Sequence, residues 1–472
     1  MKTPPRNRLL KPIKAVALAT AVTMFAAACA NNPATEAQTP VESDNLLIWT
    51  LENETARVTI QQGIMQRFEQ ASGMNVELVA LDEDEVSQVL AASVAAGNTP
   101  DAIIAVGLDG LKNLAADNLV NVAISEQVVN DLGQDTFAEQ ALRLTQSPTG
   151  EQLGVPSDGW AQLLLYRTDL FAEAGLAPPT SFEAILTAAQ TLNRPGMAGI
   201  VAATEQGAFT QQTFEHLALA NGCDFIGADG EIALDSPECI EVFDFYRTLI
   251  RDYSVPGAQD VVSTRATYFA GQAAMIIWSS FILDELAGLR NDVLPTCPEC
   301  TANPTFLAEN TGIVSTIEGF HGDRANFGEV TSLVPMVGAN PRVAEFLEFM
   351  MTDGYVDWLG VSPEGKIPVR PGNGSDPNYF ANAWAAMDTG VDSRAPLRDF
   401  YSAETIDAIL DALNTFDRWG IPQGQGDFYG AMVGQNIVSR QIGEMVNAGR
   451  TAHDAALTAQ SDSEVLRLEL GG

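Results

Sequence analysis

Basic residues are scarce in this sequence, and their scarcity excludes whole classes of partner. The 472 residues include 25 Lys and Arg against 61 Asp and Glu, which gives a formal net charge of −36. After Cys29 the only lysines are Lys112 and Lys366. Nucleic acids and anionic lipid surfaces both attract basic patches, so we expect neither as a charge-driven partner. The acidity is typical of a soluble acidic surface, and a saline habitat is the alternative.

Sequence motifs of common enzymes are also absent. The three histidines, His216, His321 and His453, are isolated and offer little for acid–base chemistry. Neither a Walker-type glycine-rich loop nor a Gly-x-Ser-x-Gly nucleophile motif occurs. We therefore expect a protein that is not an enzyme and that needs no cofactor and no metal. A secreted carbohydrate-active hydrolase remains an alternative, because its paired carboxylates leave no sequence motif.

The N-terminus has the pattern of an export signal. Five basic residues precede an apolar run that ends in small residues before Cys29, and this order predicts a signal peptide over residues 1–28. The run is too short to be a transmembrane anchor. A cysteine after small residues resembles a bacterial lipobox, which implies a diacylated, palmitate-bearing Cys29, although Ala26 stands where a lipobox usually has Leu. The polar residues 29–44 predict a flexible tether at the outer face of a membrane.

Export makes disulfides the expected state of the four remaining cysteines. They are even in number, and pairing by proximity predicts Cys223–Cys239 and Cys297–Cys300. A redox motif is the alternative for Cys297-Pro-Glu-Cys300, but it lies in a proline-rich loop and not at the start of a helix after a strand. Half of a zinc site is a further alternative, and it would need two more ligands.

Hydrophobic periodicity predicts an α/β protein with more than one core. A chain of 472 residues fits two lobes better than one. Strands are predicted near 46–49, 76–80 and 102–106, with helices between them that end at Gly73 and Gly97. This alternation predicts a parallel, helix-covered sheet, with ligands beyond the carboxyl ends of its strands. From Gly154 we predict a turn, a buried strand at 163–166 and a short helix at 169–174, and mostly helical patterns follow.

Several short motifs then occur in a fixed order over most of residues 45–370. They are Trp49 with Glu52, Phe68-Glu69-Gln70-Ala71-Ser72-Gly73, Ala95-Ala96-Gly97-Asn98-Thr99-Pro100-Asp101, the stretch from Gly154 to Phe182, Phe269-x-x-Gly-x-Ala-Ala-Met275, Phe346-Leu347 and Pro368-x-Arg370. Together they resemble the family 1 extracellular solute-binding proteins of ABC importers, the sugar-binding type that includes maltose-binding protein. Arg167 stands where the family prefers Asn, and Phe327-Gly328-Glu329 where sugar binders often have Gly-Gly-Trp. The loop 291–310, which holds two cysteines, lies outside the common pattern.

The resemblance implies a fold of the periplasmic-binding-protein type II, with two α/β lobes, a hinge and a ligand cleft between the lobes. Lobe 1 is expected at 45–160 and 326–375, and lobe 2 at 161–325 and 376–472. The implied function is capture of a carbohydrate, most simply an oligosaccharide, by a monomer that delivers it to the transmembrane subunits of an ABC permease. A non-sugar solute such as a polyamine is the alternative within the family.

Candidate ligand contacts combine aromatic rings, which pack on the apolar faces of sugars, with polar groups for the hydroxyls. They are Trp49, Glu52, Asp101, Gly107, Ser157, Asp158, Trp160, Trp278, Ser279, Glu329, Arg370 and Trp384. Each has a structural alternative. A tryptophan can fill the core, and a carboxylate in so acidic a chain can be a solvated surface group. Asp101 can cap the following turn, and Arg370 can form an ion pair between the lobes.

Overall fold

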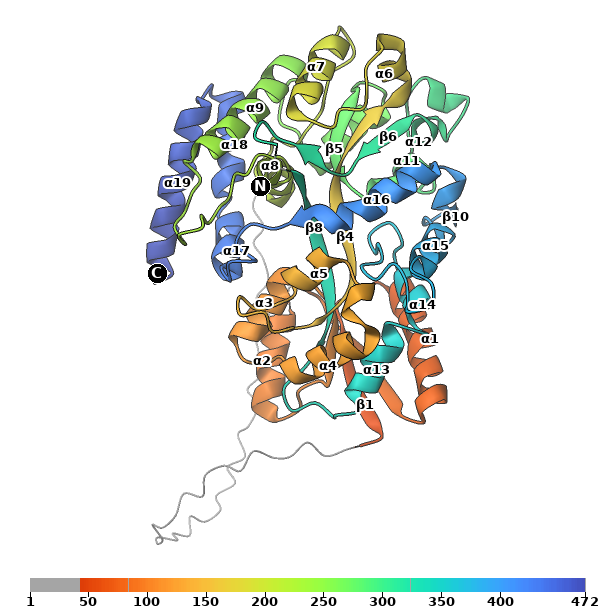
Figure 1. The fold of residues 1–472 in the computed structure, drawn as a ribbon. Coiled ribbons are helices and arrows are strands. Elements are labelled where there is room, and N and C mark those ends of the chain that lie inside the picture. Colours follow the sequence, from red (N-terminus) through yellow and green to blue (C-terminus); the bar gives the residue numbers. More distant parts are fainter. Residues whose placement is uncertain (1–42, 84, 323, 472) are drawn as a thin grey trace, which may run out of the picture. The chain divides into compact units, whose positions relative to one another are not determined.

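The computed structural model describes residues 43–83, 85–322 and 324–471 (Figure 1). The predicted signal peptide, Cys29 and nearly all of the predicted tether lie outside the described residues. All of the described residues belong to one compact unit. The lobe boundaries given above therefore remain a prediction.

The first part of the chain alternates strands and helices as predicted. The elements are β1 (Asn45–Thr50), α1 (Thr55–Ser72), β2 (Asn75–Ala80), α2 (Val86–Ala96), β3 (Ala102–Val106), α3 (Leu108–Ala116), α4 (Val122–Leu132) and α5 (Glu139–Leu144). Both β2 and β3 pair with β1 in parallel. Helix α1 buries Ile64 and Phe68 and ends at Gly73, whose φ of 73° favours glycine. The predicted parallel sheet is thus confirmed.

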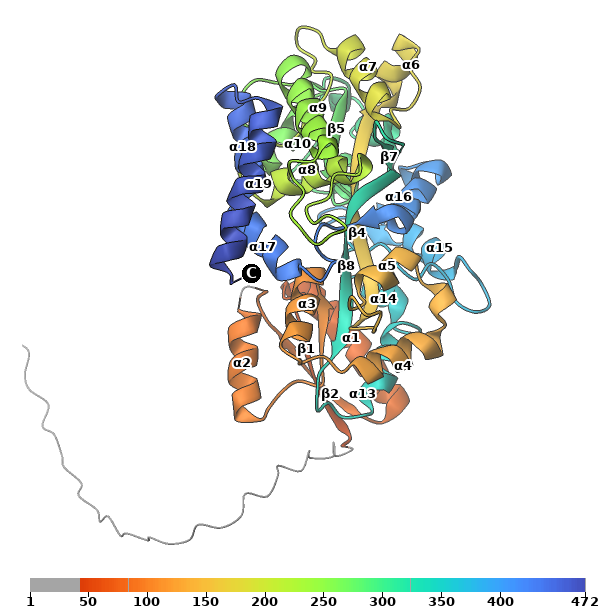
Figure 2. The ribbon, with the colours of Figure 1, turned by 60° about the vertical axis from the view of Figure 1, so that its left-hand side comes forward.

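Two long strands connect this part to the rest of the chain. The first of them begins where a turn was predicted. Strand β4 (Val155–Arg167) has 13 residues, β8 (Arg324–Pro335) has 12, and the order in the sheet is β2-β1-β3-β8-β4-β5. The predicted turn near Gly154 is instead the start of β4, since a register shift between Pro156 and Asp158 lets the strand continue beside β8. Figure 2 shows β4 and β8 running side by side between the two groups of helices.

The second part is mainly helical around the far halves of these strands. Its elements are α6 (Thr168–Ala174), α7 (Phe182–Leu192), α8 (Ala208–Ala220), α9 (Pro237–Tyr253), α10 (Val261–Phe269), β5 (Met275–Ser279), α11 (Ile282–Leu286), α12 (Phe306–Glu309), β6 (Thr311–Val314) and β7 (Ile317–Glu318). Strand β4 pairs with β5 and β6 through its second half. The aliphatic run of that half, Leu163 to Leu165, is fully buried.

The elements after β8 pack against both the first and the second part of the chain. After β8 come α13 (Val343–Met350), α14 (Tyr355–Leu359), α15 (Tyr379–Ala385), β9 (Asp388–Thr389), β10 (Ala395–Pro396), α16 (Ala403–Thr415), β11 (Phe416–Asp417), α17 (Gly426–Gly434), α18 (Ile437–Asn447) and α19 (Ala452–Glu469). Short 3-10 turns lie at 134–136, 299–301 and 397–399. Helix α17 packs on α3, and α16 packs on α5. Within the described ranges, no helix is both long and apolar enough to cross a bilayer.

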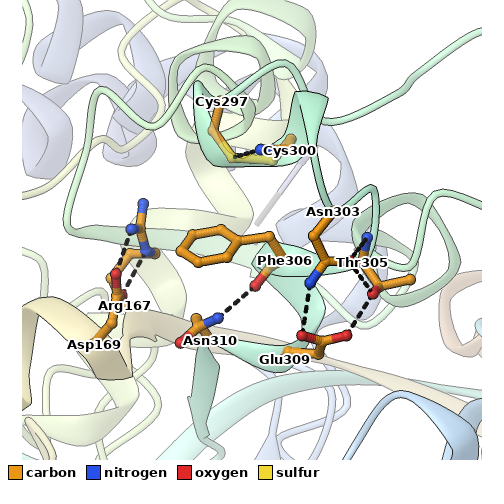
Figure 3. The surroundings of a disulfide bond; sticks show 9 residues. All are labelled: Arg167, Asp169, Cys297, Cys300, Asn303, Thr305, Phe306, Glu309 and Asn310. Atoms are coloured by element: carbon orange, nitrogen blue, oxygen red, sulfur yellow. Dashed lines mark hydrogen bonds and ion pairs between the residues drawn. A yellow bond between two sulfur atoms is a disulfide. The ribbon is translucent and has the colours of Figure 1, made fainter.

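Both predicted disulfides are present. The sulfur atoms are 2.05 Å apart in Cys223–Cys239 and 1.98 Å apart in Cys297–Cys300. Figure 3 shows that the second bridge lies in the loop that also contacts Arg167. The Arg167 guanidinium binds both oxygens of Asp169, at 2.7 and 2.6 Å, and lies 5.2 Å from the ring centre of Phe306. The unusual arginine and the unusual loop are therefore in contact with each other.

Candidate functional site

Three predicted site residues meet where β4 runs beside β8. Trp160 lies directly opposite Glu329 in the strand register. The Glu329 carboxylate accepts a hydrogen bond of 2.8 Å from the backbone N–H of Leu108, at the start of α3. Gly107 caps this helix, and a Cβ at Gly107 would lie 3.7 Å from Glu329 Oε1. The structure thus brings Gly107, Trp160 and Glu329 together.

An arginine that was not predicted from the sequence lies in the centre of this group. Arg418 follows β11, which pairs in parallel with β8 and so carries the arginine to the site. Its guanidinium forms an ion pair with Glu329 and lies 3.7 Å from a Glu215 oxygen and 3.9 Å from an Asp109 oxygen. Only 4% of the Arg418 side chain is exposed. One buried cation therefore faces three carboxylates.

Burial controls the protonation of this group. It raises the pKa of Glu215 to about 7, although Arg418 acts in the opposite direction. Burial likewise raises the pKa of Glu329, and Arg418 again opposes the change. For Arg418 itself burial lowers the pKa, but Glu329, Tyr429 and Glu215 outweigh it and raise the pKa well above its ordinary value. Arg418 stays charged, whereas Glu215 lies close to its titration point at neutral pH.

An aromatic pair forms the apolar side of the site. The half-buried rings of Trp160 and Phe281 have their centres 6.1 Å apart, and Phe327 lies 5.7 Å from Trp160. A close approach by Gly365 fixes the position of Phe281, because a Cβ at Gly365 would lie 2.1 Å from the ring. Flat rings beside carboxylates are the combination that binds sugars.

Phe281 was missed because Trp278 was chosen as the aromatic residue of this strand end. Trp278 is 5% exposed and packs in the core, with its ring 4.7 Å from that of Phe209 and 5.7 Å from the Arg265 guanidinium. The strand β5 ends at Ser279, which is half-buried, and Phe281 follows two residues later. At this strand end Trp278 is buried, whereas Phe281 is half-buried beside Trp160.

Glu52, Ser157 and Asp158 belong to a second cluster, centred on Lys366. The Lys366 ammonium lies 2.8 Å from Glu52 and 3.1 Å from Asp158, and Arg57 lies 2.7 Å from Glu52. Ser157 donates a hydrogen bond of 2.6 Å to Asp158, and the indole N–H of Trp358 donates another of 2.8 Å. Asp158 is 1% exposed.

The ionisation of this second cluster is strongly favoured. Burial opposes it, but Lys366 and Arg57 lower the pKa of Glu52 to about 2. Burial also acts against the Lys366 charge, and Asp158 with Glu52 outweighs it, so the pKa of Lys366 is raised. These groups satisfy one another within the second cluster, and the direct contact with a solute that was expected of Glu52, Ser157 and Asp158 stays a prediction.

Four further predicted residues have partners within the fold, and the structure does not place them in the group around Trp160 and Glu329. Trp49 is 4% exposed in an apolar cluster with Ile103 and Val334. Asp101 accepts backbone hydrogen bonds of 2.8 and 2.7 Å, Arg370 donates to two backbone carbonyls and a threonine hydroxyl, and Trp384 donates to a carbonyl at 2.7 Å. Arg370 therefore binds backbone carbonyl groups. Its structural alternative was an ion pair between the lobes, and the ion pairs of the described residues do not include one.

The chemistry of the site is that of binding. Carboxylates, a guanidinium and aromatic rings can hold hydroxyl groups and apolar sugar faces. Among the residues that the structure describes, no group of three or more His, Cys, Asp or Glu side chains is arranged to hold a metal ion.

Comparisons with known proteins identify the family and the fold. Residues 52–289 match the bacterial extracellular solute-binding protein family. The Escherichia coli (strain K12) protein YcjN, named as a putative ABC transporter periplasmic-binding protein, is 28% identical over 330 residues, which are 67% of this chain and 71% of YcjN. This family consists of binding proteins of ABC transporters and is not an enzyme family.

Solved structures show the same fold. The cyclic alpha-maltosyl-1,6-maltose binding protein of Arthrobacter globiformis has a TM-score of 0.66 and 17% identity, over 91% of this chain and 99% of that chain. A cyclo/maltodextrin-binding protein complexed with maltotetraose has a TM-score of 0.67 and 13% identity, over 93% and 99%. The predicted maltose-binding-protein-like fold is therefore confirmed, and the chain belongs to the bacterial extracellular solute-binding protein family.

Proposed function

We propose that this protein captures a carbohydrate beside Trp160 and delivers it to the permease of an ABC importer. The observation that carries the proposal is the aromatic pair of Trp160 and Phe281 next to the carboxylate of Glu329, a combination of apolar face and hydroxyl partner. The ligands of the structural relatives support a sugar, since they include maltose-type oligosaccharides and tagatose. No bond of the solute is made or broken in this function.

Capture would follow the closure of the two lobes that the family resemblance implies. An oligosaccharide would enter an open arrangement and be enclosed as the lobes approach each other, driven by its higher affinity for the closed state. The pocket of about 280 Å³ that includes Gly107 lies between α2 and α3, and it is not lined by Trp160, Phe281 or Glu329.

The proposal includes export and a lipid anchor. Cys29 would carry the acyl groups, and residues 29–44 would hold the binding body away from the membrane as a monomer. Growth of the producing cells with a labelled palmitate analogue tests this part. Label on the wild type and none on Cys29→Ala is expected, and equal labelling of both would contradict it.

The function itself is tested by thermal shift and calorimetry with a panel of solutes. We expect maltose, maltotetraose or another sugar to raise the melting temperature of the wild type, because a ligand that binds only the native state stabilises it. Trp160→Ala should weaken this binding about tenfold or more, which corresponds to about 1.4 kcal/mol. Tyr379→Ala is the matched control, since Tyr379 is an aromatic residue 49% exposed on α15.

The outcomes separate the alternatives. A sugar that binds but is recovered intact after long incubation supports transport, whereas released monosaccharide indicates a hydrolase. Stabilisation by spermidine and by no sugar indicates a polyamine-binding protein. If Trp160→Ala binds the sugar as tightly as Tyr379→Ala does, the proposed site is wrong.

A further inference from the structure

The surroundings of the Arg418 guanidinium are those of a binding site for a cation. Three carboxylates face it, from Asp109, Glu215 and Glu329. Two aromatic rings flank it, with the guanidinium carbon 4.6 Å from the ring centre of Phe327 and 5.3 Å from that of Tyr429. Carboxylates and aromatic faces are the groups that recognise ammonium and guanidinium ligands.

Arg418 cannot easily leave this position. Its backbone N–H donates to the Asp417 carboxylate at 2.8 Å, and Asp417 is held in turn by Arg143 at 2.7 Å. The next residue, Trp419, donates its backbone N–H to Glu215 at 2.8 Å. The acid that faces the guanidinium is therefore tied to the same short segment.

We propose that Arg418 determines the specificity of the site by acting as a built-in cation, so that the protein rejects amine and guanidinium solutes and accepts neutral polyhydroxyl ones. This inference rests on the proposed function and names the solute class of the same site. A cationic solute would have to displace the Arg418 guanidinium from its buried ion pair with Glu329 to reach the same carboxylates, which is costly. A neutral sugar does not have to displace it.

Arg418 also prepares the site for a sugar. By binding Glu329, which also accepts from Leu108, it holds that carboxylate in one orientation beside Trp160. A fixed carboxylate loses little freedom when it accepts a hydroxyl. Removal of the guanidinium should have two separate effects, namely weaker sugar binding and new binding of cations.

The test compares the wild type with Arg418→Ala and with Arg440→Ala by calorimetry and thermal shift, using ethylguanidinium, putrescine and the sugar panel as probes. Arg440 is the matched control, because it is 36% exposed and pairs with Asp462 and not with the three carboxylates. We expect ethylguanidinium to bind Arg418→Ala at least about tenfold more tightly than it binds the wild type or Arg440→Ala. It should also restore part of the melting temperature that the variant loses.

Two results would overturn the inference. One is binding of putrescine or ethylguanidinium to the wild type as tight as to the variant, and the other is a folded variant that gains no affinity for either probe. If Arg418→Ala does not fold, Arg418→Gln takes its place, because an amide can still donate to Glu329. Failure of every sugar to bind the wild type would refute the proposed function, whereas the amine measurements decide the role of Arg418 independently.

Discussion

Replacement of Lys366 by methionine should destabilise the protein strongly. The ammonium of Lys366 lies 2.8 Å from Glu52 and 3.1 Å from Asp158, and its side chain is 3% exposed. In Lys366→Met the carboxylate of Asp158 would remain buried with hydrogen bonds but with no cation, and Glu52 would keep only Arg57. Breaking a buried pair by removing one partner costs about 3–5 kcal/mol.

The lowered pKa of Glu52 corresponds to a stabilising free energy of the same size. A fall from 4.5 to about 2 corresponds to about 3 kcal/mol of stability. Because the folded pKa is lowered, this contribution is complete above pH 4.5 and is lost as the pH falls through 2. Lys366→Met should therefore lose less stability than the wild type does over this acid range, because less of the stabilisation remains to be lost.

Urea unfolding at neutral pH, repeated between pH 5 and pH 3, measures both effects. The control is Lys112→Met, which removes the other lysine after Cys29. Lys112 donates a hydrogen bond of 2.5 Å to the carbonyl of Gln146 and has no carboxylate partner among the ion pairs of the described residues. Its replacement should cost about 1 kcal/mol. Equal losses in the two variants would refute the assignment of Lys366 as a buried ionic centre.

Three other changes have clear expected results. Burial, helped by the nearby Glu364, raises the pKa of Asp284 from 3.8 to about 7, so the wild type should lose up to about 4 kcal/mol as the pH rises from 3.8 through 7. Asp284→Asn should remove this slope in urea unfolding, and an unchanged slope would contradict it. Replacing Cys297 and Cys300 by serine opens a ring between residues three apart and should cost about 2 kcal/mol; a loss well above about 3 kcal/mol would show that loop entropy is not the main effect. Gly365→Ala should displace the ring of Phe281, which lies 2.1 Å from the new Cβ, and weaken sugar binding about tenfold in calorimetry; unchanged affinity would remove Phe281 from the site.

The elements that were predictable from the sequence are those built from local patterns. Ile60, Ile64 and Phe68 recur at helical spacing before Gly73, and the structure forms a helix with that end. Strand β8 gave no such pattern, because it contains Gly328 in close contact with another segment. A Cβ at Gly328 would lie 2.7 Å from Phe416. Only the folded chain shows why a glycine lies within this strand.

The site was predictable to the extent that strand ends and motifs mark it. Trp160 and Glu329 were both candidates from the sequence, and only the structure shows that they lie opposite each other on β4 and β8. Arg418 was not predictable, since it meets Glu329 across 89 positions through the pairing of β11 with β8. Trp278 and Phe281 differ by three residues, and the sequence did not show which one points toward the core.

The scarcity of lysine has a practical consequence for measuring conformational change in this protein. After Cys29 the only primary amines on side chains are those of Lys112 and Lys366. Lys366 is charged and almost inaccessible, whereas burial lowers the pKa of Lys112 to about 8, so that at this pH about half of its amine is in the nucleophilic neutral form. Lys112 lies on α3 against Gly426 of α17, where a Cβ would approach the lysine Cβ to 3.5 Å. On a chain that starts after Cys29 and has a blocked N-terminal amine, an amine-reactive fluorophore should therefore label Lys112 ahead of Lys366 and report on the separation of these two helices when solute binds.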